Sequence, residues 1–343
     1  MQIQKDILEI IQNKTSVSSK EIYETLSNKS LATIKRYLFK LIERKLIIST
    51  GKGKATKYQL SPYYNLLYPI NIGKYFEKEI DERKIYSNFN WSLLRDILPN
   101  SDLFTKEESD HLNHLQNTFK QNISKLSLTE YHKELERLAI DLSWKSSQIE
   151  GNTYSLLETE RLLKEKEGVS GKTKEEALML LNHKEAIDFI MKHPDYLYPL
   201  SIPKIEDIHS ILTKGLKVDR NIRQRRVGIS GTNFKPLDNE FQIKEALNEM
   251  CILINNKTNI FEKSLLALLL LSYIQAFTDG NKRTARIVSN AILINHNYCP
   301  ISFRTVDSID YKKAILIFYE QHNISAFKKI FIEQYEFAIN TYF

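Results

Sequence analysis

The most informative part of the chain runs from Tyr273 to Arg286 and reads YIQAFTDGNKRTAR. It begins inside an apolar segment, residues 261–274, whose length and composition predict a buried helix. The turn formers Asp-Gly-Asn follow at 279–281, and a second helical pattern covers about 282–295. The sequence therefore predicts a helix, a tight polar loop and a second helix.

The predicted loop has the chemistry of a phosphate site. Free N–H groups and the helix dipole make a helix N-terminus attractive to anions, and Gly280 lets the backbone approach a phosphate closely. Arg283 and Arg286 share a face of the second helix, while Asp279 is a hard oxygen ligand that suits Mg²⁺. The alternative is a charged turn between core helices. The density of these residues favours a cradle for the phosphates of a magnesium nucleotide.

The stretch resembles the signature of the Fic (Fido) family, His-Pro-Phe-x-Asp/Glu-Gly-Asn-Gly/Lys-Arg-x-x-Arg. Many members of that family transfer AMP from ATP to a hydroxyl side chain of a target protein. The matching positions are Phe277, Asp279, Gly280, Asn281, Lys282, Arg283 and Arg286. The resemblance implies ATP and Mg²⁺, with the metal on Asp279, phosphates on the backbone of 280–282 and on Arg283, and the γ-phosphate on Arg286. It also implies catalytic roles for Asp279, Asn281 and Arg283.

One catalytic position departs from the family pattern. The histidine that serves relatives as general base is replaced by Gln275, and Ala276 replaces the proline. A glutamine amide can hydrogen-bond a target hydroxyl but does not take its proton at neutral pH, a role that suits histidine. We therefore expect an intact nucleotide site with weakened or altered chemistry.

The composition is that of a soluble protein with more than one unit. The chain has 343 residues. Its two cysteines, Cys251 and Cys299, have no metal-binding spacing and indicate a reducing compartment. The N-terminus lacks the apolar core of a signal peptide, and the longest apolar run, 265–271, is too short to span a bilayer. We expect a cytoplasmic protein without membrane contact; homodimer formation is left open.

The positive charge is concentrated at the N-terminus. Residues 1–62 hold 12 Lys+Arg and 5 Asp+Glu, and the remainder holds 49 − 12 = 37 basic and 42 − 5 = 37 acidic residues. The whole excess of +7 thus lies in the first 62 residues. This distribution favours a nucleic-acid-binding module joined to a neutral body.

Residues 1–62 resemble a winged helix-turn-helix domain. Helices are predicted at about 3–13, after Ser18 or Ser19, and after a turn at 27–29; a hairpin with a basic tip follows at 47–60. In such domains the third helix enters the major groove and the wing touches phosphates. The residues expected to contact DNA are Thr33, Lys35, Arg36, Lys40, Lys52 and Lys54. The alternative is a winged helix used for protein contact or dimerisation.

A second motif precedes the signature. Residues 63–127 are expected to form a linker and helical segments at about 74–98 and 106–122, and a helix from about 128 leads into WKSSQIEGNT at 144–153. This run resembles the family's inhibitory motif, Ser/Thr-x-x-x-Glu-Gly/Asn, matched by Ser146, Glu150 and Gly151. The resemblance implies that Glu150 pairs with Arg286 and blocks the γ-phosphate. The alternative is an ordinary helix end before a glycine.

The two motifs define a predicted Fic domain over residues 128–343, with an inhibitory helix near 135–151 and a core near 203–310. Within it, residues 222–236 predict a short β-hairpin that resembles the family's flap, which holds a target segment by main-chain pairing. The flap residues are Val227, Gly228, Ile229, Ser230, Gly231 and Thr232. A plain connecting hairpin is the alternative. His183 and His209 are expected to be structural.

The predicted fold is mainly α-helical, a Fic body with a small β-hairpin flap and an N-terminal winged helix. Three functions fit this sequence. The first is a protein adenylyltransferase restrained by Glu150, slow because of Gln275 and acting on a protein hydroxyl held by the flap. The second is a nucleotide-sensing, DNA-binding regulator without catalysis. The third is a toxin–antitoxin-like enzyme that modifies a translation or replication protein; Lys282 also occurs in relatives that phosphorylate.

Overall fold

The computed structural model describes residues 2–26 and 29–343, and the chain forms two compact units, Met1–Ile70 and Asn71–Phe343. Helices dominate the described residues, so the prediction of a mainly α-helical chain is confirmed. Most of the turn predicted at 27–29 lies outside the described residues. Residues 63–127 were expected to form a linker and helical segments, and 71–127 belong to the second unit.

The first unit packs three helices against a small sheet. The helices are α1 (Gln2–Lys14), α2 (Ser19–Thr25) and α3 (Leu31–Glu43), and the antiparallel strands β1 (Val17–Ser18), β2 (Ile47–Thr50) and β3 (Lys57–Leu60) have the order β1-β3-β2. Ser18 caps α2, because its hydroxyl accepts from the Glu21 N–H and the Glu21 carboxylate accepts from the Ser18 N–H. A 3₁₀ turn (Gly53–Ala55) joins β2 to β3, and α4 (Tyr64–Leu67) packs on the core through Leu67 and Tyr64.

The second unit is helical. It opens with the short elements α5 (Ile72–Phe76), a 3₁₀ turn (Ile80–Glu82) and a π-helix (Leu93–Ile97). The longer helices are α6 (Lys106–Ile123), α7 (Leu128–Ile149), α8 (Leu156–Glu165), α9 (Lys174–Lys192), α10 (Ile202–Thr213), α11 (Glu240–Asn256), α12 (Ile260–Ile274), α13 (Asn281–Asn295), α14 (Ser308–Gln321) and α15 (Ser325–Tyr342). Capping boxes begin α6, α7, α8 and α9.

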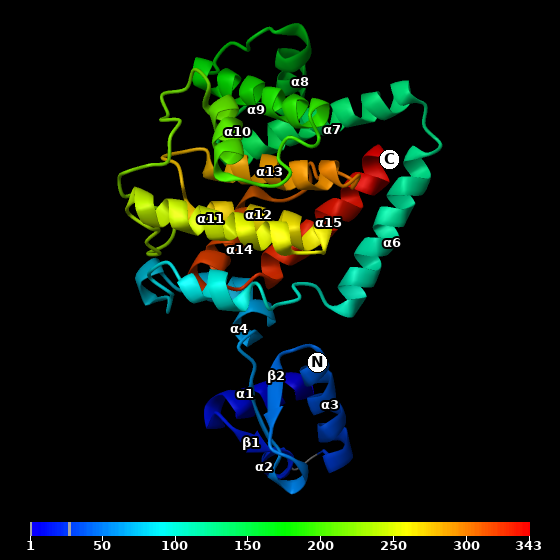
Figure 1. The fold of residues 1–343 in the computed structure, drawn as a ribbon, viewed down its shortest axis with the longest axis vertical. Helices are drawn as coiled ribbons and strands as arrows, with labels where there is room; N and C mark the ends of the chain where they lie inside the picture. The colour runs from blue at the N-terminus through cyan, green and yellow to red at the C-terminus, as the bar shows by residue number, and fades with distance from the viewer. Residues whose placement is uncertain (1, 27–28) are drawn as a thin grey trace. The chain divides into compact units, whose positions relative to one another are not determined.

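Two antiparallel helices form the centre of this unit. Every side chain from Phe261 to Ile274 in α12 is buried, and α12 packs along its length against α13. On one side α9 and α10 contact α13, and on the other α11 and α14 contact α12 (Figure 1). A helix that is apolar all round is stable only when neighbours cover every face. The loop between α12 and α13 is therefore fixed at both ends by the core.

The helix predicted at about 74–98 is wrong. Only the short elements named above form there. Two backbone N–H groups of this segment donate to other parts of the unit and not to carbonyls of their own helix. Tyr86 N–H donates to the Glu320 carbonyl (2.9 Å), and Asn90 N–H donates to the Tyr273 hydroxyl (2.9 Å). Residues Ser87, Asn88 and Asn90 are also weak helix formers. This segment therefore packs against the end of α12, where Phe89 stacks on Tyr273 (4.8 Å between ring centroids).

The β-hairpin predicted at 222–236 is also wrong. The segment is irregular, and its ladder contact is a single parallel bridge between Lys235 and Asn88. The contacts of Arg223 explain why no hairpin forms. Its backbone N–H donates to the Ala276 carbonyl (3.0 Å). Its buried guanidinium donates to the carbonyls of Gln275 (2.6 Å), Arg225 and Leu237. The chain is pinned to the α12–α13 loop and does not fold back on itself.

Among residues 2–26 and 29–343, none of the helices offers a stretch long and apolar enough to span a lipid bilayer.

Candidate active site

The loop between α12 and α13 depends on two left-handed residues. Gln275 ends α12 with φ 53° and ψ 55°, and Gly280 precedes α13 with φ 81°. A Cβ at Gly280 would lie 3.3 Å from the His209 ring, which stacks on Phe277 and hydrogen-bonds the Asp279 carbonyl through Nε2 (2.9 Å). The positive φ and this close approach both favour glycine at position 280. Burial lowers the pKa of His209, so the ring serves as a neutral support for the loop.

Asn281 holds the loop in shape. Its side-chain Oδ1 accepts from the Phe277 N–H (2.9 Å), and Nδ2 donates to the Phe277 carbonyl (2.7 Å) and to Gln275 Oε1 (3.1 Å). These bonds replace backbone pairing that the tight loop cannot make. The side chain of Asn281, expected to act on the nucleotide, is thus engaged within the protein.

Gln275 is similarly engaged. Its Nε2 donates to the Ser272 carbonyl (2.6 Å) and its Oε1 accepts from Asn281, so both ends of the amide have partners inside the loop. An amide cannot accept a proton at neutral pH. Gln275 is therefore part of the hydrogen-bond network that shapes the loop.

The two arginines of α13 are buried. Arg283 is 1% exposed; its Nη2 donates to Asp279 Oδ2 (2.8 Å), whereas Nε and Nη1 have no partner within the protein. Arg286 is 0% exposed and also has an unpartnered nitrogen, Nη1. Burial lowers the pKa of Arg283, yet a guanidinium remains protonated at any physiological pH. Burying charged N–H groups without hydrogen-bond partners costs folding free energy, so an anion bound at this end of α13 would be stabilising.

Glu150 is the anion that the chain itself supplies. It follows the last residue of α7, and its Oε1 accepts from Arg286 Nη2 (2.8 Å) while Oε2 accepts from Lys282 Nζ (3.2 Å). Burial alone would raise its pKa, but the charges and hydrogen bonds of Arg286 and Lys282 outweigh it and hold the pKa at about 2. The carboxylate is ionised throughout the physiological range, and two cations share it.

Ser146 and Tyr311 also contact Arg286, whose guanidinium carbon lies 5.3 Å from the centroid of the Tyr311 ring. The Ser146 hydroxyl accepts from Arg286 Nε (2.7 Å) and lies 2.6 Å from His183 Nε2, and the Ser146 carbonyl accepts from Arg286 Nη2 (3.0 Å). Burial and the two nearby arginines lower the pKa of His183 well below its ordinary value. A neutral imidazole therefore supports the serine, and one turn of α7 presents both Ser146 and Glu150 to α13.

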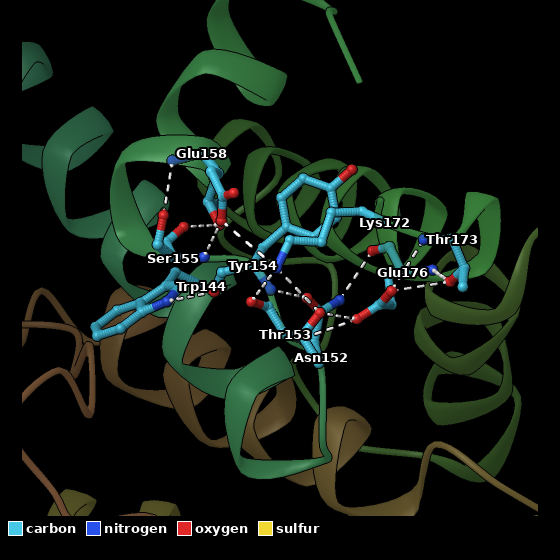
Figure 2. A network of polar contacts seen from close by, with 10 residues as sticks. Trp144, Asn152, Thr153, Tyr154, Ser155, Glu158, Lys172, Thr173 and Glu176 are labelled. Carbon is cyan, nitrogen blue, oxygen red and sulfur yellow. Dashed lines mark hydrogen bonds and ion pairs between the residues drawn. The ribbon is translucent and has the colours of Figure 1, made fainter. Parts of the chain in front are cut away.

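The chain after Glu150 is clamped onto α9. Gly151 turns the backbone with φ 102°, and Glu176 Oε1 then accepts from the N–H (2.8 Å) and hydroxyl (2.6 Å) of Thr153. These bonds, with those from Thr173, hold the pKa of Glu176 at about 2. Lys172 donates to the Thr153 carbonyl (2.6 Å). Figure 2 shows these contacts converging from three segments, and they fix the end of α7 that carries Glu150.

The flap residues and the expected metal ligand, Asp279, remain to be placed. Flap residues 227–232 form an irregular and largely exposed segment, in which Gly231 accepts from Arg83 through its carbonyl (3.1 Å). Asp279 is 64% exposed, and the described part of the chain has no group of three or more His, Cys, Asp or Glu that could hold a metal alone. Mg²⁺ is commonly bound through one or two carboxylates together with substrate phosphates. Asp279 fits that pattern.

The sequence did not reveal two contacts of this site. Arg223 is buried against the α12–α13 loop, and Lys282 shares the Glu150 carboxylate with Arg286. Arg223 gave no signal, because local spacing does not show which distant segments will bury a residue. His209 has the structural role expected of it, since it supports the loop. Lys282 could have been found, since it lies one turn before Arg286 on the same helix face.

The second unit shares its fold with solved Fic structures. Fic-1 from Caenorhabditis elegans (residues 134–508) superposes with a TM-score of 0.61 at 20% identity, covering 69% of this chain and 72% of that chain. A Fic-domain-containing signalling protein from Bacteroides thetaiotaomicron superposes with a TM-score of 0.58 at 17% identity, covering 67% and 94%. At these identities the likeness establishes the fold.

Sequence comparison points to the same family over part of this unit. Residues 199–293 match the Fic/DOC family. The chain is 31% identical over 184 residues to a protein named protein adenylyltransferase Fic from Nematostella vectensis, covering 48% of this chain and 40% of that protein. It is 26% identical over 163 residues to protein adenylyltransferase fic-1 from C. elegans, covering 45% and 31%. The matched region spans less than half the length of either relative.

The depressed pKa of Glu150 predicts a pH dependence of stability. A carboxylate whose pKa is lower in the folded state contributes stability above its unfolded pKa, near 4.5, and loses it as the pH falls toward 2. We expect Glu150→Gln to lower the free energy of unfolding by a constant amount from pH 7 to about 5.5, and the deficit to shrink at lower pH. Both tryptophans, Trp91 and Trp144, lie in the second unit, so their emission during urea unfolding reports that unit alone.

The same titration has a built-in control. Glu176 also has a pKa of about 2 and is present in both proteins, so its contribution cancels in the difference. A deficit that stays constant from pH 7 to about 3.5 would show that the Glu150 carboxylate does not interact with the two cations as the structure indicates.

Proposed function

We propose that the second unit binds ATP with Mg²⁺ and transfers AMP slowly to a protein hydroxyl, under restraint by Glu150. The observation that carries this proposal is the pair of buried arginines, Arg283 and Arg286, with unpartnered N–H groups at the N-terminal end of α13. A polyphosphate supplies the charge and the acceptors that these groups lack. The names of the sequence relatives support the class of reaction.

Each residue has a place in this proposal. The N–H groups of 280–282 and the guanidinium of Arg283 hold the phosphates, Asp279 contributes a carboxylate to Mg²⁺, and Arg286 takes the γ-phosphate once Glu150 has left it. Lys282, now on Glu150 (3.2 Å), becomes free to bind phosphate at the same moment. The cradle is preorganised, because Asn281 and His209 hold the loop without a ligand.

The bonds and the proton of the proposed AMP transfer can all be accounted for without a basic side chain. The target hydroxyl oxygen attacks the α-phosphorus, the bond to the bridging oxygen of the β-phosphate breaks, and pyrophosphate leaves. The hydroxyl proton passes to water, because Gln275 cannot accept it. Since positioning and electrostatic stabilisation supply much of such a rate, the missing base costs about 10²- to 10⁴-fold and not the whole reaction.

Radiolabel transfer tests this proposal. Purified full chain is incubated with Mg²⁺ and ATP labelled at the α-phosphate, alone and with cell lysate. We expect little label with wild type, more with Glu150→Gly, and about 10²- to 10⁴-fold more again with Glu150→Gly/Gln275→His. Arg283→Ala in the Glu150→Gly background should abolish transfer. Glu165→Gly, at another helix end and on an exposed ion pair with Arg161, is the matched control.

The outcomes separate the alternatives. Label from the γ-phosphate in place of the α-phosphate would replace AMP transfer by phosphorylation. Absence of label in Glu150→Gly with recovery in the double variant would mean a nucleotide sensor that has lost its base. Absence of label in every variant would refute the enzymatic proposal.

The first unit supports a second proposal, that the chain also binds DNA. Lys35, Arg36 and Lys40 are exposed on α3, and Lys52 and Lys54 are exposed at the β2–β3 turn; Thr33 is half-buried and hydrogen-bonds Ser30. The net +7 of residues 1–62 lies on this unit. A helix and a basic turn of this kind suit the major groove and the adjacent phosphates of duplex DNA. In this proposal the unit is a winged helix-turn-helix.

Salt dependence tests DNA binding. We expect the full chain to bind a duplex of random sequence with an affinity that falls steeply with salt, because phosphate contacts release counterions. Lys35→Gln/Arg36→Gln should weaken binding and reduce the log–log salt slope by about 2. Lys5→Gln/Lys14→Gln, at two exposed cations on α1, is the charge-matched control. If the double substitution changed neither the affinity nor the salt slope, the DNA would bind somewhere other than α3.

A further inference from the structure

The outward face of α3 carries an exposed aromatic ring among its cations. Residues exposed on this helix recur every three or four positions and so share one face, opposite the buried Ile34, Leu38 and Leu41. The exposed residues of the helix are Leu31, Ala32, Lys35, Arg36, Phe39, Lys40 and Glu43. Phe39 lies among them and is 62% exposed.

The position of Phe39 is more telling than its exposure, since single exposed apolar side chains are common. Lys35 and Arg36 precede it by about one turn, and Lys40 follows it directly. A second copy of the chain docked symmetrically on this face would bring these cations against themselves, and like charges in an interface are unfavourable. An anionic partner with an apolar group between its charges fits the face.

Duplex DNA has that chemistry. Phosphates line the edges of the major groove, and its floor presents one apolar group, the C5-methyl of thymine, which phenylalanine side chains can contact. We propose that Phe39 reads this methyl group, while Lys35, Arg36 and Lys40 bind the flanking phosphates. The inference rests on the proposed DNA binding and adds to it a preference for a base with a C5-methyl group.

Four synthetic duplexes test the inference with the full-length chain. Alternating poly(dA-dT) and poly(dG-dC) containing 5-methylcytosine carry the methyl group in the major groove, whereas poly(dA-dU) and unmodified poly(dG-dC) lack it. We expect wild type to bind each methylated polymer about fourfold more tightly than its unmethylated counterpart, as for burying one methyl group. Phe39→Ala should remove this ratio and leave the salt slope unchanged, and Phe39→Leu should retain part of it.

Controls make each outcome decisive. Leu157→Ala removes a 77% exposed apolar side chain from α8, in the other unit, and should keep the wild-type ratio. A methyl preference that persists in Phe39→Ala would come from DNA shape and would overturn the inference, as would equal binding of all four polymers. A dimer that sedimentation shows to dissociate in Phe39→Ala would assign the ring to protein contact. Absence of binding to every duplex would refute the DNA-binding proposal as well.

Discussion

The contact on which the second unit depends is the charged hydrogen bond between Glu150 and Arg286. A guanidinium with 0% exposure is costly unless an opposite charge and hydrogen-bond acceptors lie beside it. Glu150 and Ser146 supply that charge and acceptors for Nε and Nη2 from α7, and so join the end of that helix to α13. Lys282 strengthens the junction by sharing the carboxylate. The same contacts therefore hold α7 against α13 and fill the anion site.

The ion pair leaves some N–H groups of the two buried arginines without partners. Arg283 has two buried N–H groups without partners, and Arg286 has one. In the proposed function a polyphosphate would satisfy these groups, and it would compete for Arg286 with the carboxylate that occupies it. Glu176 on α9 and Lys172 just before α9 hydrogen-bond Thr153, three residues after Glu150, and so hold the chain that follows α7.

Local patterns in the sequence predicted the helices well where they were periodic. The helices around the α12–α13 loop lie within a few residues of their predicted ends, because apolar spacing and capping residues act locally. The failures involve distant partners. The helix predicted at 74–98 does not form, because backbone N–H groups of that segment donate to Glu320 and Tyr273. The hairpin predicted at 222–236 does not form, because Arg223 donates to the carbonyl of Gln275. The meeting of Glu150 with Arg286 came from the resemblance, since the spacing within each motif says nothing about the other.

Nucleotide binding to wild type and to Glu150→Gln tests most directly whether the Glu150 carboxylate occupies the place of a γ-phosphate. Titration calorimetry with Mg²⁺ would compare ATP, which has that phosphate, with ADP, which does not. The account predicts that Glu150→Gln tightens ATP binding by roughly tenfold or more, equivalent to about 1.4 kcal/mol, and changes ADP binding far less. Arg283→Ala should weaken both nucleotides. Equal changes for ATP and ADP, or none for either, would contradict the competition between Glu150 and the nucleotide for Arg286.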